Sequence, residues 1–330
     1  MASLTVASTW MNAVLDRMAR EGLDRAELTA DIRGIEQGRI STTARIEIQL
    51  SRLIWRRAVQ MTDDPLLGLK VGSQLPTQAG NVVSVIRAHS PTFGDFIQSL
   101  LRYQSLLSEG GRWLALRPVA QGVRLTYRQA PSAIAMEPQQ IDSAVASLVA
   151  YGPRALSVRL TGRGNQDPAA FSAMLGCPVT LGGAQASVDY AHATMTQPTS
   201  GADPALLSLN MAYAESLLAA HRTMDALCGN VRVAIERLGP RHATIDSVAR
   251  HIGCSPRTLQ RRLAAAGSSF KAIFDGHRME EAHILLSKSA ASVAQISERL
   301  GYSEASAFSR AVTAWWGVSP RQLRRVVLTS

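Results

Sequence analysis

Several side chains in the segment PRTLQRRL, residues 256–263, have the chemistry needed to recognise bases in DNA. Arg257, Gln260 and Arg261 share one face if the segment is a helix, because residues three and four apart are neighbours on a helix surface. An arginine donates two hydrogen bonds to guanine in the major groove, and a glutamine pairs with adenine. Arg262 is better placed for a phosphate. The predicted contact residues of this segment are Arg257, Thr258, Gln260, Arg261 and Arg262.

A second segment near the end of the chain, SEASAFSRAVTAWW, has one apolar and one small polar face. Phe308, Val312 and Trp315 follow one another at helical spacing and are expected to form a buried stripe. On the opposite face Arg310 would be the main base-contacting group, and Ala305 offers only apolar contact, for instance with a thymine methyl. The predicted contact residues here are Ala305, Ser306, Ser309, Arg310 and Thr313.

The two segments follow the same turn, which predicts two helix-turn-helix units over residues 244–263 and 292–316. Gly253 and Gly301 each follow a short helix with apolar periodicity and begin a Gly-x-Ser turn. Glycine suits such a turn because it adopts a positive φ without strain. Ser255 is placed to cap the next helix. One such segment alone could be a plain helical hairpin, and the repetition argues against that alternative.

Between the units, SFKAIFDGHRMEEAHILLSKS predicts one long core helix. About 18 residues give roughly 27 Å of helix, which could hold two recognition helices about one DNA turn apart. The two histidines of this segment, His277 and His283, are expected to be solvated or to cap the helix.

Basic residues are concentrated in the same part of the chain. The net charge is +10 over 330 residues; residues 224–330 hold 15 Lys and Arg against 8 Asp and Glu, and residues 1–223 hold 20 against 17. This excess fits an anionic partner, but charge alone does not separate DNA, RNA and a membrane surface. Hydrophobic residues make up 46% of the chain, yet we find no apolar run long enough to span a membrane and no basic leader typical of a signal peptide. We therefore expect a cytoplasmic protein without a membrane partner.

Residues 1–197 predict a mixed α+β domain. The first 75 residues have helical periodicity, two more helices follow with a break near Ser90, and WLALRPVAQGVRLTYRQ predicts a β-hairpin. CPVTLGGAQASVDYA predicts a pair of strands. The loop PTSGADP marks a boundary, so residues 198–223 are interpreted as a linker and connector helix and residues 224–330 as an all-α DNA-binding domain.

Motifs typical of enzymes are missing from the sequence. It has no G-x-S-x-G, P-loop, H-E-x-x-H, C-x-x-C or G-x-G-x-x-G pattern. Asp63 and Asp64 could suggest paired catalytic carboxylates, although a solvated helix end explains them as well. Isolated cysteines at 177, 228 and 254 lack the spacing of a metal site and suit a reducing compartment. We expect no catalytic residues, no cofactor and no metal.

The C-terminal third resembles the AraC/XylS family of bacterial transcription regulators. Its signature, I-A-x-x-x-G-[FY]-x-x-x-S-x-F-x-R-x-F-K-x-x-x-G-x-[ST]-P-x-x-[YF]-R, runs through the second unit. Ser297, Val312 and Leu323 depart from it at core positions, and Thr313 and Ala314 replace residues that are often basic. These last departures predict that the first unit supplies more of the specificity. The matching residues are Ile296, Gly301, Tyr302, Ser306, Phe308, Arg310, Gly317, Ser319, Pro320 and Arg324.

The N-terminal two-thirds resembles, through DDPLLGLKVG and AAFSAMLGCPVTLGGAQASVDYAHATMTQP, the effector domain of the ornithine-utilisation type of regulator in this family. This resemblance implies a domain for effector sensing or dimerisation, with promoter DNA, RNA polymerase, a small-molecule effector and a second copy as partners, and association with the nucleoid. It assigns no effector-binding residue. The alternative is a ligand-independent regulator whose N-terminal domain only dimerises or binds a protein.

Overall fold

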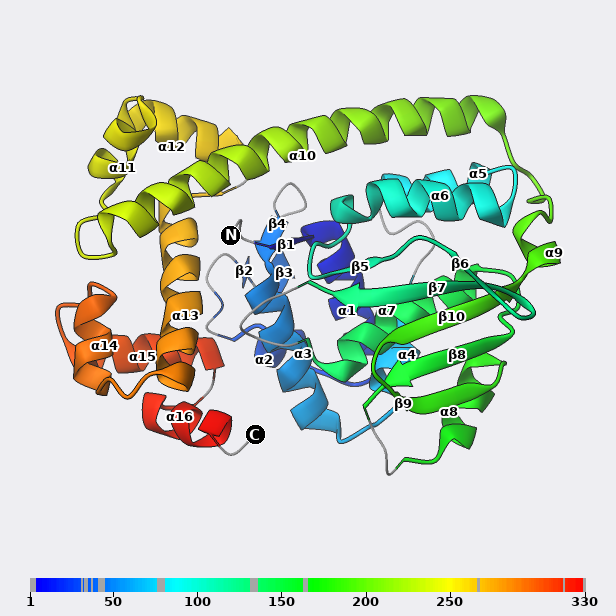
Figure 1. The fold of residues 1–330 in the computed structure, drawn as a ribbon, viewed down its shortest axis with the longest axis horizontal. Helices are drawn as coiled ribbons and strands as arrows, with labels where there is room; N and C mark the ends of the chain where they lie inside the picture. Colours follow the sequence, from blue (N-terminus) through cyan, green and yellow to red (C-terminus); the bar gives the residue numbers. More distant parts are fainter. Residues whose placement is uncertain are drawn as a thin grey trace.

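The computed structural model describes residues 4–30, 32, 35–36, 38–40, 45–75, 81–130, 136–162, 166–265, 268–316 and 318–328. An N-terminal region of helices and strands and a C-terminal helical region are connected by one long helix along an edge of the molecule (Figure 1). The predicted fold class, an α+β domain followed by an all-α domain with two helix-turn-helix units on a long joining helix, is confirmed. Gly317, part of the signature match, lies outside the described residues.

Short strands accompany the helices of the first 75 residues. β1 (Thr5–Ala7) pairs with β4 (Arg45–Glu47), and β2 (Ile35–Glu36) pairs with β3 (Arg39–Ile40). The expectation of a purely helical start was wrong because strands of two or three residues are too short to produce a periodic signal. The helices of this part are α1 (Ser8–Arg20), α2 (Arg25–Leu28), α3 (Ile48–Thr62) and α4 (Leu67–Ser73).

A larger sheet has the strand order β5-β7-β10-β8-β9, with β6 also paired to β7. The predicted hairpin is confirmed as β6–β7. The predicted pairing within residues 177–191 is wrong, because β8 lies between β9 and β10, parallel to the first and antiparallel to the second. Alternation of side chains marks a strand but does not identify its neighbour. The strands are β5 (Gly111–Trp113), β6 (Arg117–Val119), β7 (Gly122–Gln129), β8 (Ser157–Thr161), β9 (Val179–Gly183) and β10 (Ala186–Ala191).

Helices pack against this sheet, and α4 lies in close contact with α7. A Cβ atom added to Gly68 or Gly72 would overlap the carbonyl oxygen of Gln139 or Ser143, so the contact requires glycine at both positions. The break predicted near Ser90 is confirmed between α5 and α6. The remaining helices are α5 (Val82–His89), α6 (Phe93–Tyr103), the 3₁₀ helix η1 (Gln104–Leu106), α7 (Pro138–Tyr151), α8 (Pro168–Leu175) and α9 (His192–Met195).

The connecting helix α10 (Pro204–Leu238) is continuous over 35 residues, about 52 Å. Its first half contributes Ala214 and Leu218 to the core of the sheet region. Its second half contributes Val231 and Ile235 to the core of the first helix-turn-helix unit. The predicted division at residue 223 falls inside this helix, so the connector and the first helix of the C-terminal region are one rod.

The C-terminal region has two small cores that share one helix. Ile273, near the start of α13, packs with the first unit, and Met279, Ala282 and Leu286 pack with the second. In Figure 1, α11 and α12 lie at one end of α13, and α14, α15 and α16 lie towards its other end. These helices are α11 (Ile245–Ile252), α12 (Pro256–Ala265), α13 (Phe270–Lys288), α14 (Val293–Arg299), α15 (Ala305–Trp316) and α16 (Pro320–Leu328).

The two turn glycines, Gly253 and Gly301, differ in the space around them. Gly253 and Gly301 have φ of +79° and +75°. A Cβ on Gly253 would meet open space, whereas one on Gly301 would lie 2.8 Å from the carbonyl oxygen of Pro240. Both alanines would incur the cost of a left-handed conformation, but only the second would also displace backbone.

We therefore predict that Gly301→Ala destabilises the chain more than Gly253→Ala. Gly253→Ala should lower the free energy of unfolding by about 1 to 2 kcal/mol, and Gly301→Ala by clearly more. Urea unfolding followed by circular dichroism measures both. Gly253→Asn should lose less than Gly253→Ala, because asparagine tolerates this conformation. Equal losses for the two alanines would mean that the backbone at Pro240 moves without cost.

Candidate nucleic-acid interface

The first unit is built by local hydrogen bonds that the sequence predicts. Gly253 ends α11 in the left-handed conformation. Ser255 then caps α12, because its Oγ accepts a hydrogen bond from the backbone N–H of Thr258 at 3.2 Å. Ala249, four residues before the glycine, is fully buried, so the two helices approach closely at this point. The turn therefore sets the direction in which α12 leaves the unit.

Helix α12 has one buried face and one exposed cationic face. Leu259 and Leu263 are fully buried. The predicted contact residue Thr258 is half-buried, and its hydroxyl lies 2.9 Å from that of Ser255, so it also belongs to the cap. The other predicted contact residues of α12 are exposed, and none of its arginines forms an ion pair or side-chain hydrogen bond with the described residues. The exposed residues are Arg257, Gln260, Arg261 and Arg262.

The second unit repeats this construction with one change. Ser292 and Gln295 form a capping box at the start of α14. Ser297, which stands where the family usually has alanine, is buried, and its hydroxyl donates a hydrogen bond to the carbonyl of Glu304 at 3.2 Å. Its polar group is thereby satisfied, so the departure from the signature fits inside the turn.

The buried stripe of α15 differs from the prediction at its last position. Phe308 and Val312 are fully buried, but the third buried residue is Trp316, and Trp315 is half-buried. Continued steps of four lead from Phe308 to Trp316, and the Trp316 ring packs against His283 of α13 with ring centroids 6.0 Å apart. The sequence offers two adjacent tryptophans, and only the position of α13 decides between them.

The opposite face of α15 presents one free guanidinium among small side chains. Ala305 and Thr313 are exposed, and the hydroxyls of this face donate within the chain, as Ser309 does to the carbonyl of Ala305 at 2.8 Å. Ser306 contacts the carboxylate of Glu304 at 2.9 Å. Arg310 is exposed and forms no ion pair or hydrogen bond within the described part of the chain. It is therefore the cationic donor that this face offers to a ligand.

Arg278 has a structural role that its charge does not reveal. From α13 it donates hydrogen bonds to the carbonyls of Leu300 and Gly301 at 2.8 and 2.7 Å. Its guanidinium also lies over the rings of Phe274 and Tyr302, 4.1 and 4.4 Å from their centroids. Burial lowers the pKa of this arginine. Arg278 therefore holds the second turn onto the joining helix.

The histidines of α13 contradict the expectation of solvated side chains. His277 is buried, and His283 is half-buried against Trp316. Burial lowers the pKa of both, and the nearby cations Arg56 and Lys288 lower that of His283 further. They face neighbouring helices because α13 is packed on more than one side, which a helix viewed in isolation does not show.

The described residues contain no group of histidine, cysteine, aspartate or glutamate side chains that could hold a metal ion. Among the same residues, we find no helix that combines the length and apolar character needed to cross a membrane. Asp64, one of the two carboxylates considered for catalysis, pairs with Lys70 at 2.8 Å, and Asp63 is exposed at the end of α3.

Known proteins share both parts of this architecture. The family described as helix-turn-helix domain matches residues 248–326, and the arabinose-binding domain of AraC transcription regulator, N-term, matches residues 22–199. An HTH-type transcriptional regulator of Mycobacterium tuberculosis is 34% identical over 147 residues, 44% of this chain and 43% of that protein. The chain thus spans less than half the length of this relative.

The ornithine utilization regulator of Pseudomonas aeruginosa is 23% identical over 97% of this chain and 96% of its own. The crystal structure of CdpR from Pseudomonas aeruginosa is 23% identical, with 83% and 91% of the two chains covered and a TM-score of 0.44.

The contacts of Arg278 predict a loss of stability on substitution. Arg278→Ala removes two charged hydrogen bonds and leaves the carbonyls of the turn unmatched, so the C-terminal region should lose about 2 to 4 kcal/mol of unfolding free energy. Arg278→Lys keeps the charge but not the planar fork and should recover less than half of that loss. Urea unfolding monitored by tryptophan fluorescence tests both. An alanine variant as stable as the parent would show that these contacts contribute nothing net.

Proposed function

The chain belongs to the AraC family of transcription regulators, and we propose that it binds promoter DNA through α12 and α15 under the control of its N-terminal domain. The observation that carries this proposal is the exposed face of α12, where three arginines and a glutamine have no side-chain partner among the residues that the structure describes, while the other face is buried in a helix-turn-helix core. The role is non-catalytic and cytoplasmic, at the nucleoid, and promoter binding would bring the chain within reach of RNA polymerase.

The two recognition helices are proposed to contribute unequally. α12 offers several guanidinium groups, whereas α15 offers Arg310 alone. Glu304, directly before α15, places a carboxylate where a phosphate would approach and lowers the attraction there. With 19 residues, about 28 Å, α13 separates the two helices by a length close to one DNA turn. We expect α12 to determine most of the sequence preference and α15 to add affinity.

Control by the N-terminal domain is proposed to pass through α10. Glu215 accepts a hydrogen bond from the Tyr103 hydroxyl at 2.6 Å and pairs with Arg102, next to η1. His221 lies 3.4 Å from Glu109, in the loop before β5. Burial opposes ionisation of Glu109, but interactions with His221 and Thr5 prevail and lower its pKa, so the carboxylate stays charged. An effector that moves this loop would move α10, and α12 would move with it because α12 packs against the second half of α10.

The outer surface of α10 supports dimerisation, which is compatible with both the effector-responsive and the ligand-independent alternative. Apart from Glu215, which pairs with Arg102, the exposed side chains between residues 205 and 220 of this helix carry no charge, although the surface of a solvated helix is normally charged. Leu206, Leu209 and Tyr213 follow at helical spacing, and Leu209 and Tyr213 are 67% and 55% exposed. Small residues such as Ser208 and Ala212 between them would allow a second helix to approach. A second copy of the chain offers the same surface about a twofold axis, so we propose a homodimer through α10.

Arginine substitutions test the DNA contact. On a site obtained by selection from random DNA, Arg261→Ala should cost about 1 to 3 kcal/mol and relax the base preference at one position. Arg262→Ala should weaken all sequences similarly and reduce the salt slope by about 1. Fluorescence anisotropy at several salt concentrations measures both, with Arg117→Ala on the exposed sheet edge as the control. Unchanged affinity after replacing Arg257, Arg261 and Arg310 together would refute the docking.

Sedimentation velocity tests the dimer. Leu209→Glu places a charge in the middle of the uncharged surface and should convert a dimer into a monomer at micromolar concentration. Leu156→Glu is the matched control, since Leu156 is also an exposed leucine but lies away from α10. If both variants keep the sedimentation coefficient of the parent chain, α10 does not form the interface.

A further inference from the structure

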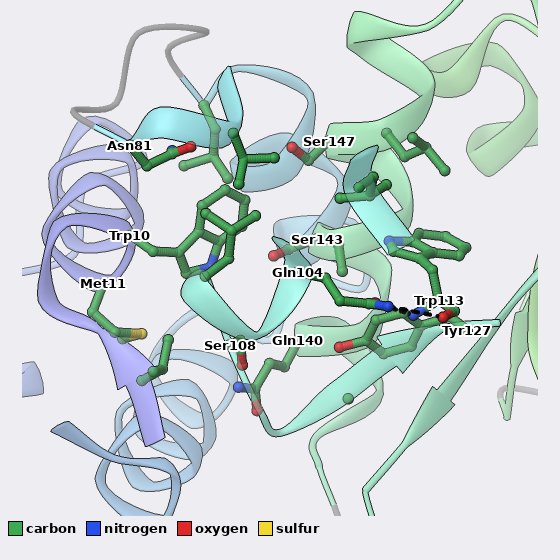
Figure 2. Close-up of a pocket in the computed structure, with 18 of the residues that line it drawn as sticks. Trp10, Met11, Asn81, Gln104, Ser108, Trp113, Tyr127, Gln140, Ser143 and Ser147 are labelled. Atoms are coloured by element: carbon green, nitrogen blue, oxygen red, sulfur yellow. Dashed lines mark hydrogen bonds between the residues drawn. The ribbon is translucent and has the colours of Figure 1, made fainter. Parts of the chain in front are cut away.

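A cavity lies inside the N-terminal region, apart from the recognition helices (Figure 2). Its walls come from α1, α3, α5, α6, α7 and the strands β5 and β7. The cavity has a volume of about 130 Å³ and is partly open to solvent, which is enough for the body of a small organic molecule such as one aromatic ring. The recognition helices do not use this space.

Aromatic rings form much of the cavity wall. Trp10 and Trp55 contribute from α1 and α3, and Trp113 and Tyr127 contribute from β5 and β7 with ring centroids 5.1 Å apart, edge to face. Burial raises the pKa of Tyr127, so its phenol stays neutral. Such a wall binds an apolar or aromatic body by burial and ring contacts.

One face of α7 lines the cavity with uncharged polar groups. Gln140, Ser143 and Ser147 follow at helical spacing and are drawn around the cavity in Figure 2. Gln140 is 8% exposed; its Nε2 donates to the hydroxyl of Ser51 at 3.0 Å, and its Oε1 has no hydrogen-bond partner in the described part of the chain. The Nδ2 of Asn81 likewise has none there. Buried polar atoms without partners are costly, so a bound group that donates to Gln140 would recover that cost.

The charge of the cavity wall restricts the ligand further. Among the described lining residues Arg87 is the charged side chain, and aspartate and glutamate do not occur. A cation would be desolvated here without a compensating carboxylate. The hydrogen-bonding groups of the wall are mainly hydroxyls and amides, which suit an uncharged polar group.

We propose that this cavity binds the effector, an uncharged molecule with an aromatic or aliphatic body and an amide or hydroxyl head that donates to Gln140. The regulatory role of this ligand rests on the proposed function, whereas its binding in the cavity does not depend on that function. Leu107 and Ser108 line the cavity directly before Glu109, which contacts His221 of α10. The ligand therefore touches the loop that holds α10. The close contacts of Gly68 and Gly72 in α4 fix the position of α7, the helix that carries Gln140.

Three probes with the same body and different heads test the ligand class: 2-phenylacetamide, phenylacetate and 2-phenylethylamine. Each is added to the full chain without DNA, and the melting temperature and tryptophan fluorescence are recorded. Trp10, Trp55 and Trp113 line the cavity, so binding should change the emission. We expect the amide to raise the melting temperature and change the fluorescence, phenylacetate to bind more weakly, and the amine to have no effect. A full set of negative results, or an amine that binds as well as the amide, would overturn the proposal.

Two variants locate the binding. Gln140→Glu keeps the size of the side chain and should weaken the amide at least about tenfold while admitting 2-phenylethylamine. Gln74→Glu, the same change on an exposed residue, should leave both unchanged. Ser147→Phe fills part of the cavity and should abolish amide binding with an unchanged circular dichroism spectrum. If the amide binds equally well to Gln140→Glu and Ser147→Phe, the site lies elsewhere.

Anisotropy with the selected DNA site is measured in parallel. DNA binding without probe binding would overturn the cavity proposal alone, and probe binding without DNA binding would contradict the proposed function alone. Probe binding that leaves the DNA affinity unchanged would remove the effector role from the cavity.

Discussion

One uninterrupted helix is buried in two hydrophobic cores, and the arrangement of the two regions depends on this constraint. The first half of α10 packs on the sheet region through Ala214 and Leu218, and the second half packs on α11 and α12 through Val231 and Ile235. A hinge between the regions would have to break backbone hydrogen bonds in the middle of α10. Movements at one end are therefore transmitted as rotation or translation of a rod, the simplest coupling that two packed units permit.

A second, polar contact complements the helix. Arg232 of α10 is buried and pairs with Glu280 of α13 at 2.8 Å. Gly276 of α13 lies so close to the Glu47 carboxylate at the start of α3 that a Cβ there would overlap it. Arg52 of α3 is buried near Glu280 and Tyr127, and burial lowers its pKa to about 10. Charged groups thus meet where α3, α10 and α13 converge, so the orientation of the joining helix also depends on the N-terminal region.

Arginines of the C-terminal region either stabilise the fold or are available to DNA, and their hydrogen-bond partners and burial distinguish the two groups. Arg278 and Arg324 donate to backbone carbonyls and stabilise the fold. Arg257, Arg261 and Arg310 are exposed, and among the described residues they have no such partner. The basic excess of residues 224–330 therefore overstates the charge available to DNA, because part of it is used inside the domain.

The sequence by itself determined the features that depend on a few neighbouring residues. The positive φ of Gly253 and Gly301, the cap at Ser255 and the inward leucines of α12 all follow from local hydrogen bonding and helical periodicity. Many helices and strands were predictable for the same reason. The two helix-turn-helix units gave the clearest signal because their pattern occurs twice.

Only the tertiary structure decided features that join distant segments. The choice of Trp316 over Trp315 depends on α13, the position of β8 between β9 and β10 depends on a non-local register, and the cavity depends on helices from three parts of the chain. The continuity of α10 is similar, since the sequence was divided at residue 223, where the backbone hydrogen bonds of this helix continue. Periodicity reports which face of an element is apolar, and it contains no information about which element that face meets.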